Sequence, residues 1–174
     1  MKKLLIAAAM VCAAALAQAA TVNWAISSVK DSSGAAPTAG WAVMAFYTAK
    51  DAGSDAIVSA ITSKTAGTLA FESKELGVAL GSGRVAAHDA TAAAITDTSK
   101  NYDFYFVVFN NADATKATEY AMVSTPNKEY SGMAGKFTVS ANFSSATWQS
   151  VPEPTSGLLM LLGMAGLALR RRRA

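Results

Sequence analysis

Hydrophobic and polar positions alternate with a period of two in several short stretches between residues 20 and 143. The clearest stretches are 21–26 and 136–143, where every second residue is a large or small apolar one. Shorter versions cover 69–71 and 76–80. This alternation is typical of strands that bury one face and expose the other. We therefore expect half-buried strands at these four places.

Two further stretches, 41–48 and 102–109, are apolar on both faces. A strand with two apolar faces is expected in the centre of a sheet, where both faces are covered. Turn-forming residues separate the apolar stretches, since Gly, Pro, Asn, Asp and Ser favour turns for distinct conformational reasons. The turn segments are 31–34, 81–83, 110–113, 125–127 and 131–132.

One short helix is expected at residues 54–64. Ser54 is a candidate N-cap, Ile57, Val58 and Ile61 would point inward, and Gly67 lies beyond the end. A serine side chain at the N-cap can accept a hydrogen bond from a free backbone N–H of the first turn, and a glycine is common just after the last helical residue. The alanine-rich stretch 85–96 fits either a helix or a strand, and its pattern does not decide between them.

Seven to nine strands are predicted within residues 20–143. This pattern predicts an all-β domain, namely an antiparallel β-sandwich or a jelly-roll-like fold, with one short helix. No repeat of fixed period is present, so a solenoid or propeller is not expected. From Ser144 the chain becomes polar, and we interpret residues 144–150 as a linker.

The charge is distributed unevenly along the chain. The 174 residues have a formal net charge of +3. Residues 20–150, however, contain eight lysines and Arg84 against eleven acidic residues, which leaves −2. The basic excess therefore comes from the two termini. Since the middle has no basic stripe, nucleic acid is not an expected partner.

The N-terminus has the three parts of a secretory signal peptide. Lys2 and Lys3 form a positive start, an uncharged apolar run covers 4–16, and Ala17 and Ala19 frame a small-x-small cleavage site. We expect residues 1–19 to be removed by signal peptidase after Ala19, with cleavage after Ala17 or Ala20 as alternatives.

The single cysteine, Cys12, lies inside this predicted signal peptide. A lipidated cysteine would need a small residue directly before it, and Val11 stands there. The mature chain is therefore expected to contain no disulfide and no thiolate site.

The C-terminus is built from three blocks. Val151, Pro152, Glu153 and Pro154 come first, an apolar stretch at 155–169 follows, and Arg170, Arg171, Arg172 and Arg173 precede the last residue. The prolines hold the first block extended, because each fixes its own φ and disfavours a helical residue before it. The apolar stretch predicts a single transmembrane helix of about 22 Å at 1.5 Å per residue. The arginines would keep the C-terminus in the cytoplasm.

This order of blocks resembles the PEP-CTERM sorting signal of Gram-negative bacteria, with residues 151–174 carrying the resemblance. The resemblance implies that an exosortase, a membrane enzyme, recognises the Pro-Glu-Pro motif. It also implies an anchored intermediate in the inner membrane and release to the cell surface or the extracellular matrix. A simple stop-transfer anchor that is never cut is the alternative reading.

No residue pattern in the middle of the chain identifies a catalytic or metal site. Three groups of residues are candidates. His88-Asp89 with Ser82 could form a catalytic triad, Glu72 and Glu75 could form a glycosidase pair, and Asp51 and Asp55 could bind a cation. For each, a surface or structural role is the expectation. Gly81-Ser82-Gly83 lacks the Lys-Ser/Thr of a phosphate loop. We therefore expect no catalytic residues, no metal and no cofactor.

Three functions are compatible with these features. The first is an exported, non-enzymatic surface or matrix protein of structural or adhesive type. The second is a carbohydrate-binding module for secreted polysaccharide, which would need several aromatic side chains exposed in one row. The aromatic candidates are Trp24, Trp41, Trp148, Tyr102, Tyr105, Tyr120 and Tyr130. The third is a secreted hydrolase that would depend on His88 or Glu75.

Overall fold

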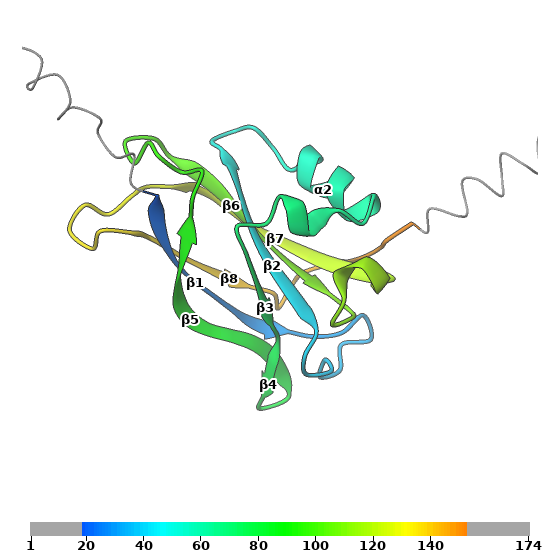
Figure 1. Cartoon of the computed structure of the whole chain (residues 1–174). Coiled ribbons are helices and arrows are strands. Elements are labelled where there is room, and N and C mark those ends of the chain that lie inside the picture. Colours follow the sequence, from blue (N-terminus) through cyan, green and yellow to red (C-terminus); the bar gives the residue numbers. More distant parts are fainter. Residues whose placement is uncertain (1–18, 153–174) are drawn as a thin grey trace, which may run out of the picture.

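Two β-sheets form the protein in the computed structural model, which describes residues 19–152. The four-stranded sheet has the order β4 (Gly77–Ala79), β5 (Ser82–Ala92), β1 (Ala20–Val29), β8 (Phe137–Asn142). The five-stranded sheet has the order β3 (Glu72–Glu75), β2 (Ala42–Ala49), β6 (Tyr102–Phe109), β7 (Glu119–Lys128), β9 (Trp148–Ser150). Figure 1 shows their arrangement. The predicted β-rich fold is thereby confirmed.

The main core lies between the two sheets, and alternation along the strands fills it. Along β8 and from residue 20 to 26 of β1, every second residue is buried and the residues between them are half-buried or exposed. The large buried side chains from these two strands and from β6 are Val22, Trp24, Ile26, Phe104, Phe106 and Phe137. The period-two pattern therefore identified the inward residues of β1 and β8.

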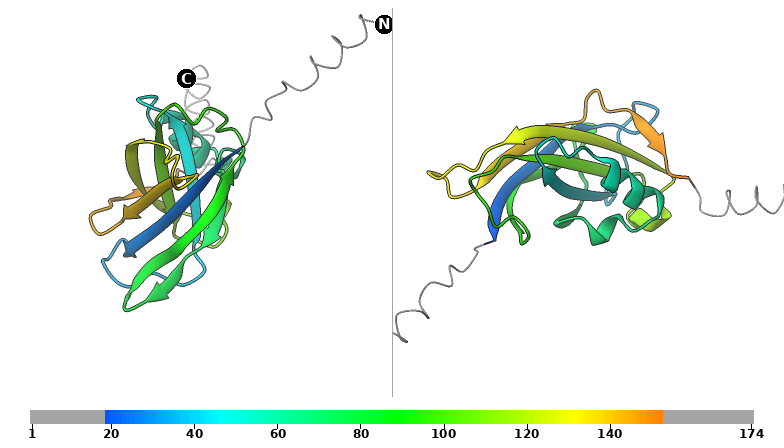
Figure 2. Two further views of the ribbon diagram at one scale, coloured as in Figure 1. Left: turned by 90° about the vertical axis from the view of Figure 1, so that its left-hand side faces the viewer. Right: turned by 90° about the horizontal axis from the view of Figure 1, so that it is seen from above.

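A second apolar layer covers the outer face of the five-stranded sheet. It contains helix α2 (Asp55–Thr62) and the 3₁₀ helices η1 (Ala66–Thr68) and η2 (Ala114–Lys116). Ile57 and Ile61 of α2 are buried in the same cluster as Phe46 and Phe109. Seven of the eight residues of β6 are buried, because this strand has apolar neighbours on both faces. The expected central position of 102–109 is confirmed (Figures 1 and 2).

The expected helix is present with Ser54 at the N-cap position, although it ends at Thr62, two residues earlier than expected. α2 begins at Asp55, directly after Ser54, but the Ser54 side chain makes no capping hydrogen bond. Asp55 supplies a negative charge in the first turn instead, where the helix dipole favours it. The ambiguous stretch 85–96 belongs for the most part to strand β5.

The expectation of a purely antiparallel arrangement is wrong at one place. β1 and β8 run parallel, with partners from Val22↔Phe137 to Ser27↔Asn142. All other strand pairs between residues 19 and 152 are antiparallel. Alternation reports which face of a strand is buried and carries no information about its direction, so the sequence pattern could not reveal this pair.

The alternating stretch 76–80 does not bury all its apolar residues. Leu76 is buried, but Val78 and Leu80 are exposed because β4 and the start of β5 form a hairpin that extends beyond the core. Leu80 and Gly81 have positive φ angles of 51° and 72° at its turn. Gly83 is required for packing, since a Cβ there would lie 2.6 Å from Leu76 Cδ2.

Several predicted segments lie wholly or partly outside the described residues. These are the signal peptide up to residue 18, with Ala17; Glu153 and Pro154 of the motif; the helix 155–169; and the arginines 170–173. Between residues 19 and 152, no helix is both long and apolar enough to cross a membrane.

A buried carboxylate joins the turn after β2 to the end of β7 at one end of the five-stranded sheet. Asp103 in β6 is 6% exposed and accepts hydrogen bonds from the backbone N–H groups of Asp51, at 2.9 Å, and Asn127, at 2.7 Å. Asp51 and Asn127 have φ angles of 63° and 54°, a region that disfavours residues with a Cβ. The register of β6 with β7 shifts between Tyr102 and Phe104, next to this carboxylate.

Replacing Asp103 by Ala should therefore destabilise the domain by on the order of 3 kcal/mol, because two hydrogen bonds to a charged acceptor are lost. Asp103→Asn should lose about half as much, since its amide offers one acceptor oxygen. Urea unfolding of the purified domain measures both values. The control Asn127→Gly keeps the N–H donor and should stay within about 1 kcal/mol of the wild type. Equal stability of Asp103→Ala and wild type would contradict this role of Asp103.

Candidate functional site

The chain that leads into the C-terminal motif is part of the folded domain. Residues 144–150, which we expected to be a linker, contain strand β9, which pairs antiparallel with β7 through Glu119↔Ser150 and Ala121↔Trp148. The Tyr120 hydroxyl donates a hydrogen bond of 2.6 Å to Gln149 Oε1. The polar composition concealed this strand, because only one of its three residues faces the interior and the other two are exposed.

The side chain of β9 that faces the interior is Trp148, which is half-buried and packs against the main core. Its indole Nε1–H donates to the Lys30 carbonyl at 2.9 Å. Its ring lies edge-on to Trp41, with 5.6 Å between the ring centroids. Trp148 thereby ties the end of the domain to the chain after β1.

The first residue of the motif, Val151, is also held by the domain. Its backbone N–H donates to the Thr118 carbonyl at 2.8 Å. Its side chain is 5% exposed and belongs to the outer apolar cluster with Ala117 and Tyr120. Pro152, the next residue, is exposed. The domain surface thus ends within the motif itself.

The predicted signal-peptidase site lies directly before the first strand. Ala19 precedes β1, and Ala20 is buried with its backbone N–H bonded to the Ile95 carbonyl at 3.0 Å. The start of β1, in blue, and the orange end of the described chain lie at opposite ends of the domain (Figures 1 and 2). Cleavage after Ala19 remains a prediction, and it would leave β1 whole.

His88 forms a polar cluster with a partner that the sequence did not suggest. Its Nε2 lies 3.1 Å from Glu72 Oε2, and its Nδ1 lies 3.0 Å from the Ala86 carbonyl. Glu72 also accepts hydrogen bonds from Trp24 Nε1 at 2.9 Å and forms an ion pair of 3.0 Å with Lys74. The rings of Trp24 and His88 meet edge to face at 4.6 Å. The Glu72 cluster, formed by Trp24, Glu72, Lys74 and His88, thus joins the two sheets.

The electrostatics of the Glu72 cluster favour an ionised carboxylate. Burial raises the pKa of Glu72, but hydrogen bonds from Trp24 and Lys74 and the nearby charges of His88 and Lys74 outweigh it, so the pKa is lowered overall. A carboxylate with three donors around it is suited to bridging strands. It is poorly suited to proton transfer near neutral pH, where a general acid needs a raised pKa.

The triad considered from the sequence is not assembled. Ser82 begins β5, whereas His88 lies six residues further along the same strand, about 20 Å away at 3.3 Å per residue. Asp89 is the neighbour of His88 in the strand and accepts instead from Asn23, at 2.6 Å, and Lys136, at 3.0 Å. These two hydrogen bonds lower the pKa of Asp89.

The two carboxylates of each of the other acidic pairs also do not face a common site. Glu72 and Glu75 occupy opposite ends of β3, and Glu75 is exposed. Asp51 lies in the turn held by Asp103, and Asp55 is in the first turn of α2. Among residues 19–152, no group of three His, Cys, Asp or Glu side chains is arranged to hold a metal ion.

The aromatic side chains do not form an exposed row, which counts against stacking on sugar rings. Trp24, Tyr105 and Tyr120 are buried at 7% exposure or less. The half-buried ones pack against the main core; they are Trp41, Tyr102, Tyr130 and Trp148.

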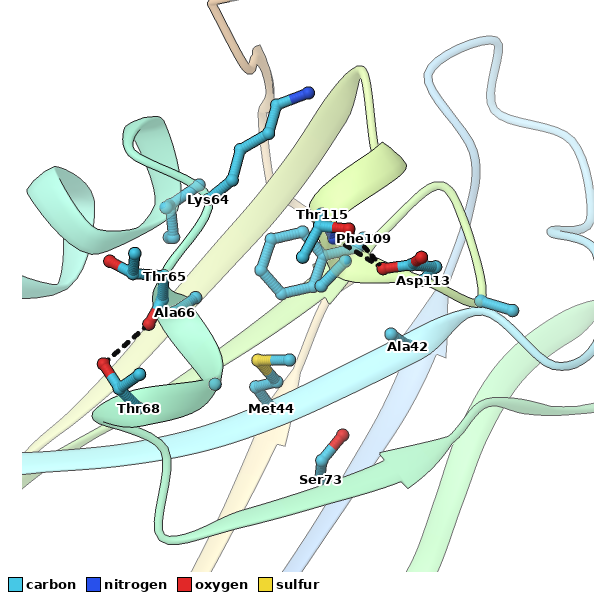
Figure 3. Close-up of a pocket in the computed structure, with 14 residues that line it drawn as sticks. Ala42, Met44, Lys64, Thr65, Ala66, Thr68, Ser73, Phe109, Asp113 and Thr115 are labelled. Carbon is cyan, nitrogen blue, oxygen red and sulfur yellow. Dashed lines mark hydrogen bonds between the residues drawn. The ribbon is translucent and has the colours of Figure 1, made fainter. Parts of the chain in front are cut away.

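One surface cavity of about 540 Å³ lies between η1 and η2, over the outer face of the five-stranded sheet. Met44 and Phe109 form its apolar floor (Figure 3). The rim hydroxyls are used locally, since Thr68 donates to the Thr65 carbonyl at 2.8 Å and Thr115 donates to Asp113 at 2.6 Å. The ammonium end of Lys64 extends away from Met44 (Figure 3). The polar side chains around the cavity therefore do not converge on a common binding position.

Sequence reasoning missed both the Glu72–His88 contact and the docking of Val151. Glu72 and His88 are 16 residues apart on strands of different sheets. No local pattern encodes such a contact. A tryptophan in a polar segment shortly before the motif was the one signal that could have indicated β9.

A family model described as the PEP-CTERM protein-sorting motif matches residues 150–173. The expected resemblance is thus confirmed for this segment, and it indicates an exported protein that is anchored in a membrane and processed by an exosortase. No curated protein and no solved structure matched the chain.

The Glu72 cluster predicts a pH-dependent stability. Because the folded-state pKa lies below the ordinary value of 4.5, ionised Glu72 stabilises the fold above that pH. This stabilisation is lost as the pH falls through the lowered value. Glu72→Gln should therefore be less stable than the wild type by on the order of 2 kcal/mol at pH 7, and the difference should shrink at pH 3.

Urea unfolding at both pH values measures this difference. Glu75→Gln, on the same strand but exposed, is the matched control and should change the stability by less than about 0.5 kcal/mol. A Glu72→Gln penalty of equal size at pH 3 and pH 7 would show that the carboxylate charge is not what stabilises the cluster.

Proposed function

We propose that this chain is an exported protein of the cell surface or extracellular matrix, sorted and released by an exosortase-like enzyme. The observation that carries the proposal is the match of residues 150–173 to the sorting motif. The order of the chain supports it: an export signal, a folded domain, the motif, an apolar stretch and an arginine cluster. In this order the domain faces outward while both charged ends stay in the cytoplasm.

The domain itself has a structural or adhesive role in this proposal and no catalytic one. Both ring nitrogens of His88 have partners within the fold, and Glu72 is held by three donors. The outer face of the four-stranded sheet presents small polar side chains, which suits contact with a hydrated matrix; these are Thr21, Asn23, Thr91, Thr138, Ser140 and Asn142.

Extracellular polysaccharide is the partner class that fits this setting. The domain of residues 20–150 has a formal charge of −2, so attraction to a polyanion is not expected to hold it in the matrix. Recognition of a neutral polymer would use hydrogen bonds to hydroxyl and amide side chains, since the aromatic rings are packed in the core.

The proposal predicts two cuts in a host that produces an exosortase. The product recovered outside the cell should begin at Ala20 and lack the apolar stretch and the arginines, which intact-mass measurement detects. Glu153→Ala should keep the tail and stay in the membrane fraction, because the motif is altered. Ser156→Ala, just beyond the motif, is the matched control and should be processed. A wild-type chain recovered from the cytoplasmic membrane with its tail intact would overturn the proposed sorting.

A further inference from the structure

We propose that the folded domain controls access to its own sorting motif, so that β9 and Val151 must detach from the domain before the tail is removed. The inference rests on the proposed function, because it concerns the regulation of the same processing step. It is carried by the docking of β9 and Val151, which no feature of the motif itself requires.

The segment is anchored on both faces of the five-stranded sheet. Trp148 packs toward the main core, whereas Val151 enters the outer cluster. Between them, Gln149 receives the hydrogen bond of the Tyr120 hydroxyl. Sliding or rotating the segment on the sheet edge would break these contacts, and Val151 follows directly on Ser150, which is paired with Glu119 of β7.

Docking removes part of the motif from reach. An enzyme that binds an extended peptide uses its backbone groups and pockets for its side chains. The backbone N–H of Val151 is bonded to the Thr118 carbonyl, and its side chain is 5% exposed. Neither group is available to a second protein while β9 is paired.

Docking also shortens the tether between the domain and the membrane. From Val151 to Thr155, where the apolar stretch begins, there are four residues, which span at most about 14 Å. The next firm anchor upstream is Phe143, which is 3% exposed and whose N–H bonds to the Ser27 carbonyl at 2.9 Å. From Phe143 the tether has twelve residues and reaches about 40 Å. Opening β9 thus lengthens the tether roughly threefold and gives an enzyme room beside the domain.

The opening does not require the domain to unfold. β9 has three residues and lies at the sheet edge, paired only with β7. Edge segments of this kind open at a lower free energy than the core strands. The main core between the sheets can remain intact while β9 is detached.

A reversible disulfide between β9 and β7 tests the proposal. Glu119 and Ser150 are directly paired, and opposed residues of antiparallel strands have Cα separations that suit a disulfide. The chain without its predicted signal peptide contains no other cysteine. The double variant Glu119→Cys/Ser150→Cys is made in the full chain, in spheroplasts that also contain an exosortase. A thiol oxidant closes the disulfide and a reductant opens it.

The oxidised double variant should lose its tail at least tenfold more slowly than either single-cysteine variant treated in the same way, and reductant should restore the rate. Equal rates for the oxidised double variant and the single-cysteine variants would overturn the control by β9 while leaving the sorting proposal intact. If neither the wild type nor any variant loses the tail, the sorting proposal itself is contradicted.

The opposite change should accelerate processing. Gln149→Ala removes the hydrogen bond from Tyr120 at an exposed position and leaves the motif unaltered. It should speed tail removal about twofold to fivefold. Trp148→Ala should speed it further, with circular dichroism confirming that the domain is still folded. Unchanged or slower tail removal in a folded Gln149→Ala variant would count against the proposal.

Discussion

The structure depends on a five-stranded sheet that is apolar on both faces. Its central strand β6 is buried along nearly its whole length, so water must be excluded from two sides at once. The four-stranded sheet covers one side and builds the main core. On the other side, α2, η1, η2 and the chain at Val151 share the cover. The first residue of the sorting motif is therefore part of the layer that the sheet requires.

Two carboxylates connect distant parts of the fold, Asp103 within the five-stranded sheet and Glu72 between the two sheets. Asp103 ties the turn after β2 to the end of β7 through two backbone N–H groups. Glu72 ties β3 to β1 and β5 through Trp24 and His88. Each carboxylate accepts hydrogen bonds from several surrounding donors. These bonds compensate for the cost of removing the carboxylate and its donors from water. A histidine that resembles a catalytic residue in the sequence thus has a bridging role in the fold.

The start of the sorting motif is docked on the folded domain through β9 and Val151. A signal of this type could act as an independent tail, separated from its cargo by a flexible spacer. Here β9 occupies the place of that spacer and packs the half-buried Trp148 against the main core. In the proposed mechanism, folding of the domain and exposure of the motif are coupled through the pairing of β9 with β7.

The sequence by itself determined the C-terminal sorting motif, the strand-rich fold, the inward faces of β1 and β8 and the central position of β6, because these follow from local order, charge and periodicity. The family match bears out the C-terminal motif, whereas the signal peptide and its cleavage site remain predictions. Only the tertiary structure decided the parallel pairing of β1 with β8, the joining of Glu72 to His88, and the docking of Trp148 and Val151. These features depend on which distant strands become neighbours, and a pattern that repeats every two residues records the buried face of a strand but not its direction or its partner.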